Sequence, residues 1–276
     1  MSKGALLIAC NNTQVDYIKQ AIFCAERIKQ YLNIPVSLVT DNASYLEANY
    51  QHEFDNVIEI SSENNNYKTY RDGVYKEYKL QWKNLDRHRA YELSPYDETI
   101  LMDTDYILCN DCLKYCFEQS NDIMLYKNST ELSGWRDVSE FKHISANGID
   151  FYWATVIYFR KSKQTELFFN LVSHIKEYWY HYKNLYRITA NTFRNDFAFS
   201  IAIHIMNGHM SGNFVKQLPG KKYYTVDKDI CLDIKNNKVK FLLQKKDSID
   251  YFPATVEGCN VHIMNKFSLN RLIDEL

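Results

Sequence analysis

The chain has 276 residues, of which 46% are hydrophobic, so it is long enough to bury a substantial core within one domain. The 33 basic and 34 acidic residues nearly cancel to a formal net charge of -1, which argues against strong non-specific binding to DNA. No stretch approaches the roughly 18 apolar residues that a transmembrane segment needs, and an odd count of 7 cysteines predicts reduced thiols in a cytoplasmic protein.

The first third of the chain alternates short apolar runs with a helical period. The opening run is apolar throughout and ends in polar residues, which is typical of a strand covered on both faces, as in parallel sheets. The apolar residues that follow recur near helical spacing. This order of elements predicts an α/β sheet. Strands are expected at residues 4–12, 36–42 and 54–61, and a helix at residues 14–32.

The middle and end of the chain continue the same pattern. Residues 64–78 are polar and rich in tyrosine, which predicts a loop leading into a helix over 79–93 that Ser94-Pro95 ends. Further strands are expected at 98–108, 121–128, 151–162, 238–243 and 257–264, and helices at 110–120, 164–187 and 195–208. No repeat or clear linker interrupts this order, so residues 1–276 are expected to form a single α/β domain of Rossmann-like type. Its central sheet should be mixed but mostly parallel, with helices on its flanks.

Two carboxylates interrupt the strand expected at residues 98–108. Asp103 and Asp105 flank Thr104 where an apolar run ends, and residues two apart on an extended backbone point to the same side. In open α/β sheets, ligands bind beyond the carboxyl ends of the strands. Two hard oxygen donors at that place suit Mg²⁺ or Mn²⁺ bound together with a substrate phosphate. An acidic turn or a helix N-cap is the simpler alternative.

Three cysteines follow the aspartates directly. Cys109, Cys112 and Cys116 invite a zinc or iron–sulfur interpretation, but no fourth cysteine lies nearby in the sequence. The same spacing places all three on one face of a helix. Buried thiols are therefore the favoured interpretation.

Residues 94–108, LSPYDETILMDTDYIL with its flanking Leu93, resemble the core of nucleotide-sugar glycosyltransferases of the GT-A fold, nearest to the family of glycogenin and bacterial galactosyltransferases. The resemblance implies that Asp103 and Asp105 hold a divalent metal against a nucleoside diphosphate. It implies a nucleotide-binding half at residues 1–128 and an acceptor-side half at 129–276.

The resemblance also assigns roles outside this motif. Contacts to the nucleoside are expected from residues that follow the first two strands, and contacts to the diphosphate from basic residues of the following loop. The metal would gain a late histidine as ligand, and a lysine after it would bind the diphosphate. These expectations name Ala9, Asn11, Asn12 and Asp41 for the nucleoside, Arg71, Lys79 and Lys266 for the diphosphate, and His262 for the metal.

Several positions depart from the family's pattern or have a simpler explanation. The family usually has Gly three residues after the histidine and a lysine later, whereas this chain has Asn265 and an early Lys266. Asp196, with Asn195 beside it, matches an acidic residue that faces the donor sugar, although Asp is also a good helix N-cap.

The predicted function is transfer of a sugar from a nucleoside diphosphate sugar, with UDP favoured, to a hydroxyl group. No well-placed general base is evident, which favours a retaining outcome. The acceptor stays open among a glycan, a protein side chain, a lipid-linked sugar and a modified DNA base. The alternatives are a nucleotidyltransferase or another metal-dependent phosphotransferase, and a non-catalytic protein that binds sugar nucleotides.

Overall fold

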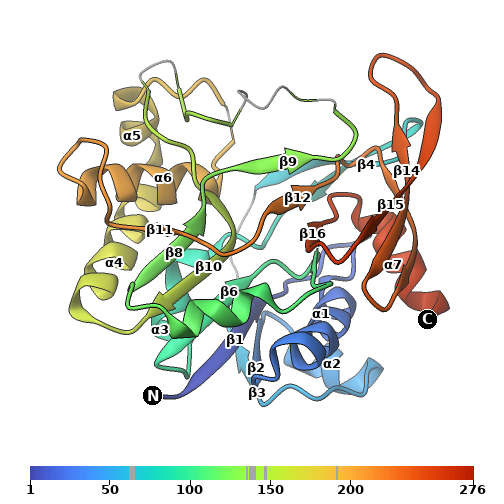
Figure 1. The fold of residues 1–276 in the computed structure, drawn as a ribbon, viewed down its shortest axis with the longest axis horizontal. Coiled ribbons are helices and arrows are strands. Elements are labelled where there is room, and N and C mark those ends of the chain that lie inside the picture. The colour runs from blue at the N-terminus through green and yellow to red at the C-terminus, as the bar shows by residue number, and fades with distance from the viewer. Residues whose placement is uncertain (62–65, 135, 137–140, 146–147, 191) are drawn as a thin grey trace.

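The computed structural model describes residues 1–61, 66–134, 136, 141–145, 148–190 and 192–276. A seven-stranded sheet forms its centre, built from β1 (Lys3–Ile8), β2 (Val36–Thr40), β3 (Asn56–Glu59), β6 (Glu98–Met102), β8 (Ile123–Tyr126), β10 (Trp153–Arg160) and β11 (Lys216–Gln217). The strand order is β11-β8-β10-β6-β1-β2-β3 (Figure 1). β10 pairs antiparallel with β6 and β8, and the other neighbours pair in parallel. The predicted α/β class with a mixed, mostly parallel sheet is confirmed.

Burial on both faces explains why the central strands are apolar throughout. Every residue of β2 and β6 is buried, and in β1 only Lys3 is exposed. The helix α1 (Tyr17–Leu32) packs against β1 and β2, and α6 (Asn195–Met206) packs against β10. The remaining helical segments are α2 (Ala43–Asn49), α3 (Ala90–Leu93), α4 (Lys163–Glu177), α5 (Trp179–Leu185), α7 (Lys266–Glu275) and the 3₁₀ turns η1 (Asp86–Arg89) and η2 (Cys112–Glu118).

Two smaller sheets extend the domain beyond the central sheet. β7 (Tyr106–Ile107), β16 (Val261–His262), β12 (Lys222–Tyr224) and β9 (Ser129–Glu131) form one sheet in that order. β13 (Ile230–Lys235), β14 (Lys238–Gln244) and β15 (Tyr251–Glu257) form an antiparallel sheet that buries its apolar side with α7 in a second core. The pairing of β16 with β7 places His262 opposite Tyr106, directly after the two aspartates.

The loop expected over residues 64–78 is wrong where the structure describes it, since residues 64 and 65 lie outside the described residues, and the first half of the helix expected over 79–93 is also wrong. β4 (Tyr67–Asp72) and β5 (Lys76–Gln81) form an antiparallel hairpin, and only η1 and α3 are helical after it. Gly73 in the turn has a φ of 73°, which residues with a side chain rarely adopt. Tyr70 is buried, and its hydroxyl bonds the Tyr17 hydroxyl at 3.0 Å, so packing against α1 holds the hairpin in place.

The strand expected at 98–108 is divided into β6 and β7 by a turn at Thr104 and Asp105, so the extended backbone expected at the two aspartates is wrong. The helix expected at 110–120 is the 3₁₀ turn η2, and other expected elements differ at their ends. The helix expected at 164–187 divides into α4 and α5, because Tyr178 leaves the helical conformation with φ -100° and ψ 35°. The elements that were not predicted include β9, β11, β12, β13, β15 and α7. The seven cysteines are all free, and Cys109 and Cys116 are buried, as expected of thiols that pack in the core, whereas Cys112 is only partly buried. Among the described helices, none combines the length and apolar character needed to cross a membrane.

Gly4 in β1 provides a test of how closely the sheet packs. A Cβ atom at this position would overlap the ring of Tyr96, whose hydroxyl is hydrogen-bonded to Ser37 Oγ at 2.7 Å. We expect Gly4→Ala to lower the free energy of unfolding by about 1–3 kcal/mol, measured by urea denaturation. The same substitution should cost clearly less in a Tyr96→Leu background, since the smaller side chain can move aside. An equal cost in both backgrounds would contradict the overlap.

Candidate active site

The turn that carries the two aspartates is fixed by backbone hydrogen bonds to two distant segments. Asp103 N donates to Thr155 O of β10 at 2.9 Å, and Ile263 N, just after β16, donates to Asp105 O at 2.9 Å. Tyr106 N closes the turn by donating to Asp103 O at 3.1 Å. The carboxylates are therefore held at the carboxyl end of β6 by segments from three parts of the chain.

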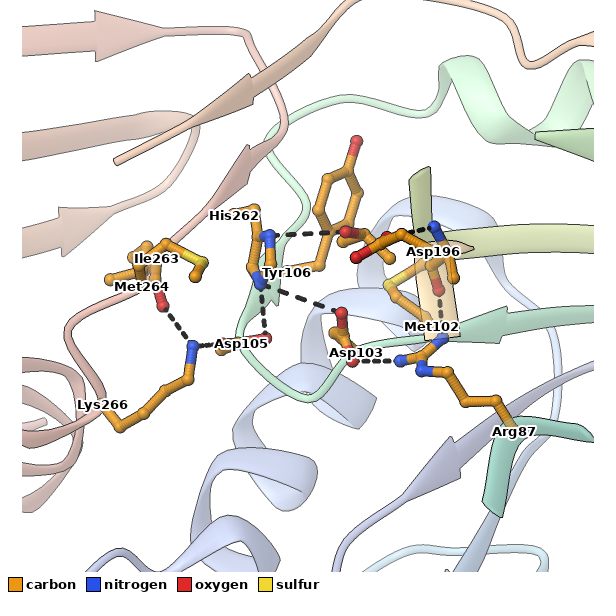
Figure 2. Close-up of polar contacts among 12 residues, drawn as sticks. Arg87, Met102, Asp103, Asp105, Tyr106, Asp196, His262, Ile263, Met264 and Lys266 are labelled. Atoms are coloured by element: carbon orange, nitrogen blue, oxygen red, sulfur yellow. Dashed lines mark hydrogen bonds and ion pairs between the residues drawn. The ribbon is translucent and has the colours of Figure 1, made fainter. Parts of the chain in front are cut away.

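His262 completes a group of three metal-type ligands with the aspartates. Its Nε2 atom lies 3.1 Å from Asp105 Oδ1 and 3.8 Å from Asp103 Oδ2 (Figure 2). One ligand atom from each residue lies within 4.8 Å of the others, and two carboxylate oxygens with one imidazole nitrogen form a donor set that suits Mn²⁺. Thr155 Oγ1 lies 3.4 Å from His262 Nδ1 and helps to orient the ring.

Burial keeps the histidine neutral. Burial, together with the nearby charge of Lys222, lowers the pKa of His262 to about 3, and the carboxylates of Asp103 and Asp196 only partly oppose this. A neutral imidazole has an unprotonated ring nitrogen, which is the form that binds a metal. The three residues therefore fit a divalent cation in both geometry and protonation state.

Each carboxylate at the site is also bonded to a cationic side chain. The Arg87 guanidinium bonds Asp103 and the carbonyl of Ala154, and the Lys266 ammonium bonds Asp105 (Figure 2). Lys266 Nζ also donates to Ile263 O at 3.2 Å.

Asp196 is held in the same way. Its Oδ2 accepts from Arg194 at 2.6 Å, and its Oδ1 accepts from Ala154 N at 2.8 Å. Arg194 occupies the N-cap position of α6, without a capping hydrogen bond from its side chain, so the simple capping explanation for Asp196 is wrong. Despite burial, these bonds and the charge of Arg194 hold the pKa of Asp196 below its usual value, and the carboxylate stays ionised.

These groups surround a cavity of about 330 Å³. Asp103, Asp105 and His262 line it together with Ile8, Tyr17, Trp82 and Asn84 from the first third of the chain and Trp153, Asn195 and Asp196 from the second half. Of the residues predicted from the sequence, seven line it: Asp103, Thr104, Asp105, Asn195, Asp196, His262 and Lys266.

The residues predicted to contact the nucleoside lie elsewhere or are bonded locally. Asn11 and Asn12 line a separate hollow beside the start of α1. The Asn11 side chain bonds Asp16 at 2.9 Å, and Asn12 Nδ2 donates to Gln81 O at 3.1 Å. Asp41 pairs with Lys83 at 2.9 Å, and Ala9 is fully buried. None of these four is among the residues that line the 330 Å³ cavity.

Strand alternation changes which basic residue of the hairpin faces the cavity. Arg71 pairs with Glu77 at 2.7 Å on the outside, and Lys79 is exposed. Lys68, on the other face of β4, lines the cavity, and its ammonium lies 4.5 Å from the ring centroid of Trp82 and 4.7 Å from that of Tyr70. In a strand over Tyr67–Asp72, alternate side chains point to opposite faces, which would have placed Lys68 and Arg71 on different sides. Assigning this segment to a loop hid that signal.

Sequence reasoning also missed Arg87, Thr155 and Lys222. Arg87 lies 16 positions before its partner Asp103 in a basic stretch with no motif, and Thr155 lies inside an apolar strand. Lys222 is 1% exposed, and its ammonium lies 3.7 Å from the ring centroid of Trp153 with no hydrogen-bond acceptor among the described residues. No local pattern distinguishes these residues, because each acquires its partner through the tertiary fold.

No family model and no curated protein matches the chain. Solved structures of glycosyltransferases do match. GlyE from Streptococcus pneumoniae TIGR4 is 12% identical with a TM-score of 0.43, over 79% of this chain and 45% of that chain. An active-site mutant of LgtC is 11% identical with a TM-score of 0.47, over 78% of this chain and 72% of that chain.

The galactosyltransferase LgtC in complex with donor and acceptor sugar analogues is 13% identical, with a TM-score of 0.45 over 78% of this chain and 72% of that chain. This chain thus matches less than half the length of the GlyE chain. At such low identity, the activity has to be argued from the residues of this chain.

Lys222 packs against Trp153, which lines the cavity, and it provides a test of how this buried lysine affects the stability of the protein. Burial lowers its pKa from 10.5 to about 7, against the opposing charges of Asp196 and Asp103. Since a buried ammonium without an acceptor is costly, we expect Lys222→Met to raise the free energy of unfolding at pH 7 by about 1 kcal/mol or more.

The same substitution should change the pH dependence of folding. Between about pH 7 and 10.5 the unfolded chain binds a proton at Lys222 that the folded chain does not, so wild-type stability rises with pH. Lys222→Met should reduce this rise by up to about 1.4 kcal/mol per pH unit, measured by urea denaturation from pH 7 to 9. Lys161→Met is the control and should lower stability, because Lys161 Nζ donates to Ser94 O at 2.7 Å. A destabilised Lys222→Met with an unchanged pH slope would contradict this account.

Proposed function

We propose that this protein is a glycosyltransferase that transfers a sugar from a nucleoside diphosphate sugar, with UDP favoured, to a hydroxyl group. The observation that supports this most is the meeting of Asp103, Asp105 and His262 with basic side chains in one cavity of about 330 Å³. Paired carboxylates with a neutral histidine suit a divalent cation, and the lysines and arginine around them suit a diphosphate. The cavity volume falls in the range of small-molecule sites.

In this proposal Asp103, Asp105 and His262 hold Mn²⁺ or Mg²⁺, and Thr104 shapes the turn between the two carboxylates. The cation, when bound, supplies Lewis-acid stabilisation of the charge on the departing diphosphate. Lys68, Lys266 and Arg87 add positive charge on the same side of the cavity, where a leaving group develops negative charge.

The two ends of the cavity would hold the two ends of the donor. The rings of Tyr17 and Trp82 offer apolar faces for a base, and Asn84 offers an amide close by. The transferred sugar would then lie at the opposite end, next to Asn195 and Asp196. The division into a nucleotide-binding half at 1–128 and an acceptor-side half at 129–276 belongs to this proposal. The roles of Ala9, Asn11, Asn12, Asp41, Arg71 and Lys79 at the donor stay predictions.

A retaining outcome is part of the proposal. Inversion needs a carboxylate or imidazole free to take the proton of the acceptor hydroxyl. Within the described part of the cavity, each of the three aspartates already bonds a cationic side chain, which supports transfer without such a base. The bond from the anomeric carbon to the phosphate oxygen would break with its electron pair leaving on the diphosphate. The acceptor oxygen would bond to that carbon, and its proton would pass to the departing phosphate.

Asp196 would face the positive charge that develops at the anomeric carbon. Its pairing with Arg194 and with Ala154 N fixes its orientation, which is what electrostatic stabilisation requires. The acceptor itself is a hydroxyl of a glycan, protein, lipid-linked sugar or modified DNA base. The seven free thiols support the cytoplasmic location predicted from the sequence.

A screen of nucleotide sugars with Mn²⁺ tests the proposed function without an acceptor. We expect slow hydrolysis of one or a few donors, with uridine diphosphate sugars the most active, and loss of the activity in excess chelator. Cleavage between the phosphates, which releases a nucleoside monophosphate, would favour a phosphotransferase. Tight binding of Mn²⁺ and UDP in calorimetry without any turnover would favour a non-catalytic binding protein.

Asp105→Asn tests the role of the carboxylate pair. The amide keeps the size of the side chain but removes one negative charge from the cation site, so we expect donor hydrolysis to fall at least about 100-fold. Excess Mn²⁺ should recover little of it. Asp250→Asn, an exposed aspartate far from the cavity, is the matched control and should leave hydrolysis unchanged. Full activity of Asp105→Asn at saturating Mn²⁺ would refute the assignment.

Asp196→Asn separates binding from chemistry at the sugar end. Because Asp196 would act on charge that appears only in the transition state, we expect kcat for hydrolysis to fall about 100-fold or more while KM changes little. Proton NMR of the first-formed sugar product reports its anomeric configuration, which should match the donor. A product of inverted configuration would contradict the retaining proposal.

A further inference from the structure

The Lys266 ammonium is hydrogen-bonded to a carboxylate oxygen of Asp105 that could otherwise be a ligand of a metal ion. This lysine is the first residue of α7 and is 6% exposed, and its ammonium bonds Asp105 Oδ2. The other oxygen of the same carboxylate lies 3.1 Å from His262 Nε2. In the free protein the Asp105 carboxylate is therefore shared between a lysine and a histidine (Figure 2).

The two basic residues on the aspartate pair differ in how firmly they are held. The Arg87 guanidinium is planar and bonds both Asp103 and the Ala154 carbonyl of β10, so it is fixed at two points. The Lys266 ammonium also bonds one carboxylate and one carbonyl, Asp105 and Ile263 O at 3.2 Å, but it makes both contacts through a single nitrogen at the end of a flexible four-carbon chain. Lys266 also lines the cavity, so its ammonium can reach a ligand there.

The position of Lys266 along the chain explains this contact. It follows His262 by four residues, directly after the short segment that joins β16 to α7. Asn265 N-caps α7 by accepting from Ser268 N at 2.9 Å, which starts the helix at Lys266 and places that residue beside Asp105.

Electrostatics then links cation binding to nucleotide binding. A divalent cation on Asp105 would lie a few ångströms from the ammonium of Lys266, and like charges repel strongly in a buried site. The repulsion is removed when the ammonium finds another anion. A diphosphate in the same cavity supplies one.

We propose that Lys266 competes with the divalent cation for Asp105 in the free protein and moves to the diphosphate when cation and nucleotide bind together. The cation and the nucleotide diphosphate then bind cooperatively, each raising the affinity for the other by the same factor. This inference rests on the proposed function, since it takes the Asp103, Asp105 and His262 group as the cation site.

Calorimetric titration of Mn²⁺, with and without saturating UDP, tests the competition in the wild type, Lys266→Met and Lys266→Gln. In the wild type, Mn²⁺ alone should bind weakly and UDP should strengthen it strongly. Removing the competing charge should tighten binding of Mn²⁺ alone by at least about tenfold. The factor by which UDP strengthens Mn²⁺ binding should fall by a similar amount. Thermal unfolding confirms that each variant is folded, and Lys266→Gln keeps a hydrogen-bond donor beside Asp105 if the methionine variant is unstable.

Lys127→Met is the matched control. It also removes an ammonium that pairs with an aspartate, Asp150 at 2.7 Å, but neither residue lines the cavity. The affinity of this variant for Mn²⁺ alone should stay within about threefold of the wild type, because the charge it removes lies outside the cation site. Lys266→Arg keeps a charge on Asp105 and should keep Mn²⁺ binding weak without UDP.

The competition is refuted if both Lys266 variants bind Mn²⁺ alone no more than threefold tighter than the wild type. It is equally refuted if Lys127→Met tightens Mn²⁺ binding as much as they do. In either case the proposed function survives as long as Mn²⁺ and UDP still bind the wild type together. A wild-type protein that binds neither Mn²⁺ nor UDP under any of these conditions would refute the proposed function itself, and this inference with it.

Discussion

Two negative charges held side by side at the end of a buried strand are the constraint on which the site depends. Asp105 is 3% exposed, and an ionised carboxylate at such a place is strongly unfavourable unless a cation neutralises it. Arg87 and Lys266 do this in the free protein. The planar Arg87 guanidinium is held through two nitrogens, whereas Lys266 is held through one nitrogen on a flexible chain. We therefore propose that Arg87 stays and Lys266 leaves when the pair of carboxylates exchanges part of its neutralisation for a metal ion.

The fold produces this arrangement by bringing three distant segments to one edge of the sheet. β6 delivers the aspartates, the antiparallel β10 contributes the carbonyls of Ala154 and Thr155, and β16 brings His262 beside the turn. Backbone hydrogen bonds join all three, so the geometry of the charged side chains rests on rigid elements. Residues placed in this way need little reorganisation when a ligand binds, which is the condition for electrostatic catalysis.

Sequence patterns predicted those features that depend on residues close together in the chain. Apolar runs in the sequence predicted the buried strands, and Asp103 and Asp105 indicated the edge of the sheet where the candidate site lies. The hairpin of β4 and β5 was missed because its strands are polar and half exposed, and its stability comes from packing Tyr70 against Tyr17 of α1. Arg87 and Lys222 gave no local signal, because what makes each of them notable is a partner or a ring that only the folded chain provides.

The most direct test of the account is a crystal grown with Mn²⁺ and UDP, with anomalous diffraction recorded at the manganese absorption edge. The account predicts one strong peak within coordination distance of Asp103, Asp105 and His262, with the diphosphate of UDP on its other side and Lys266 turned from Asp105 toward a phosphate oxygen. A nucleotide bound elsewhere, or a peak that none of these three residues reaches, would contradict it.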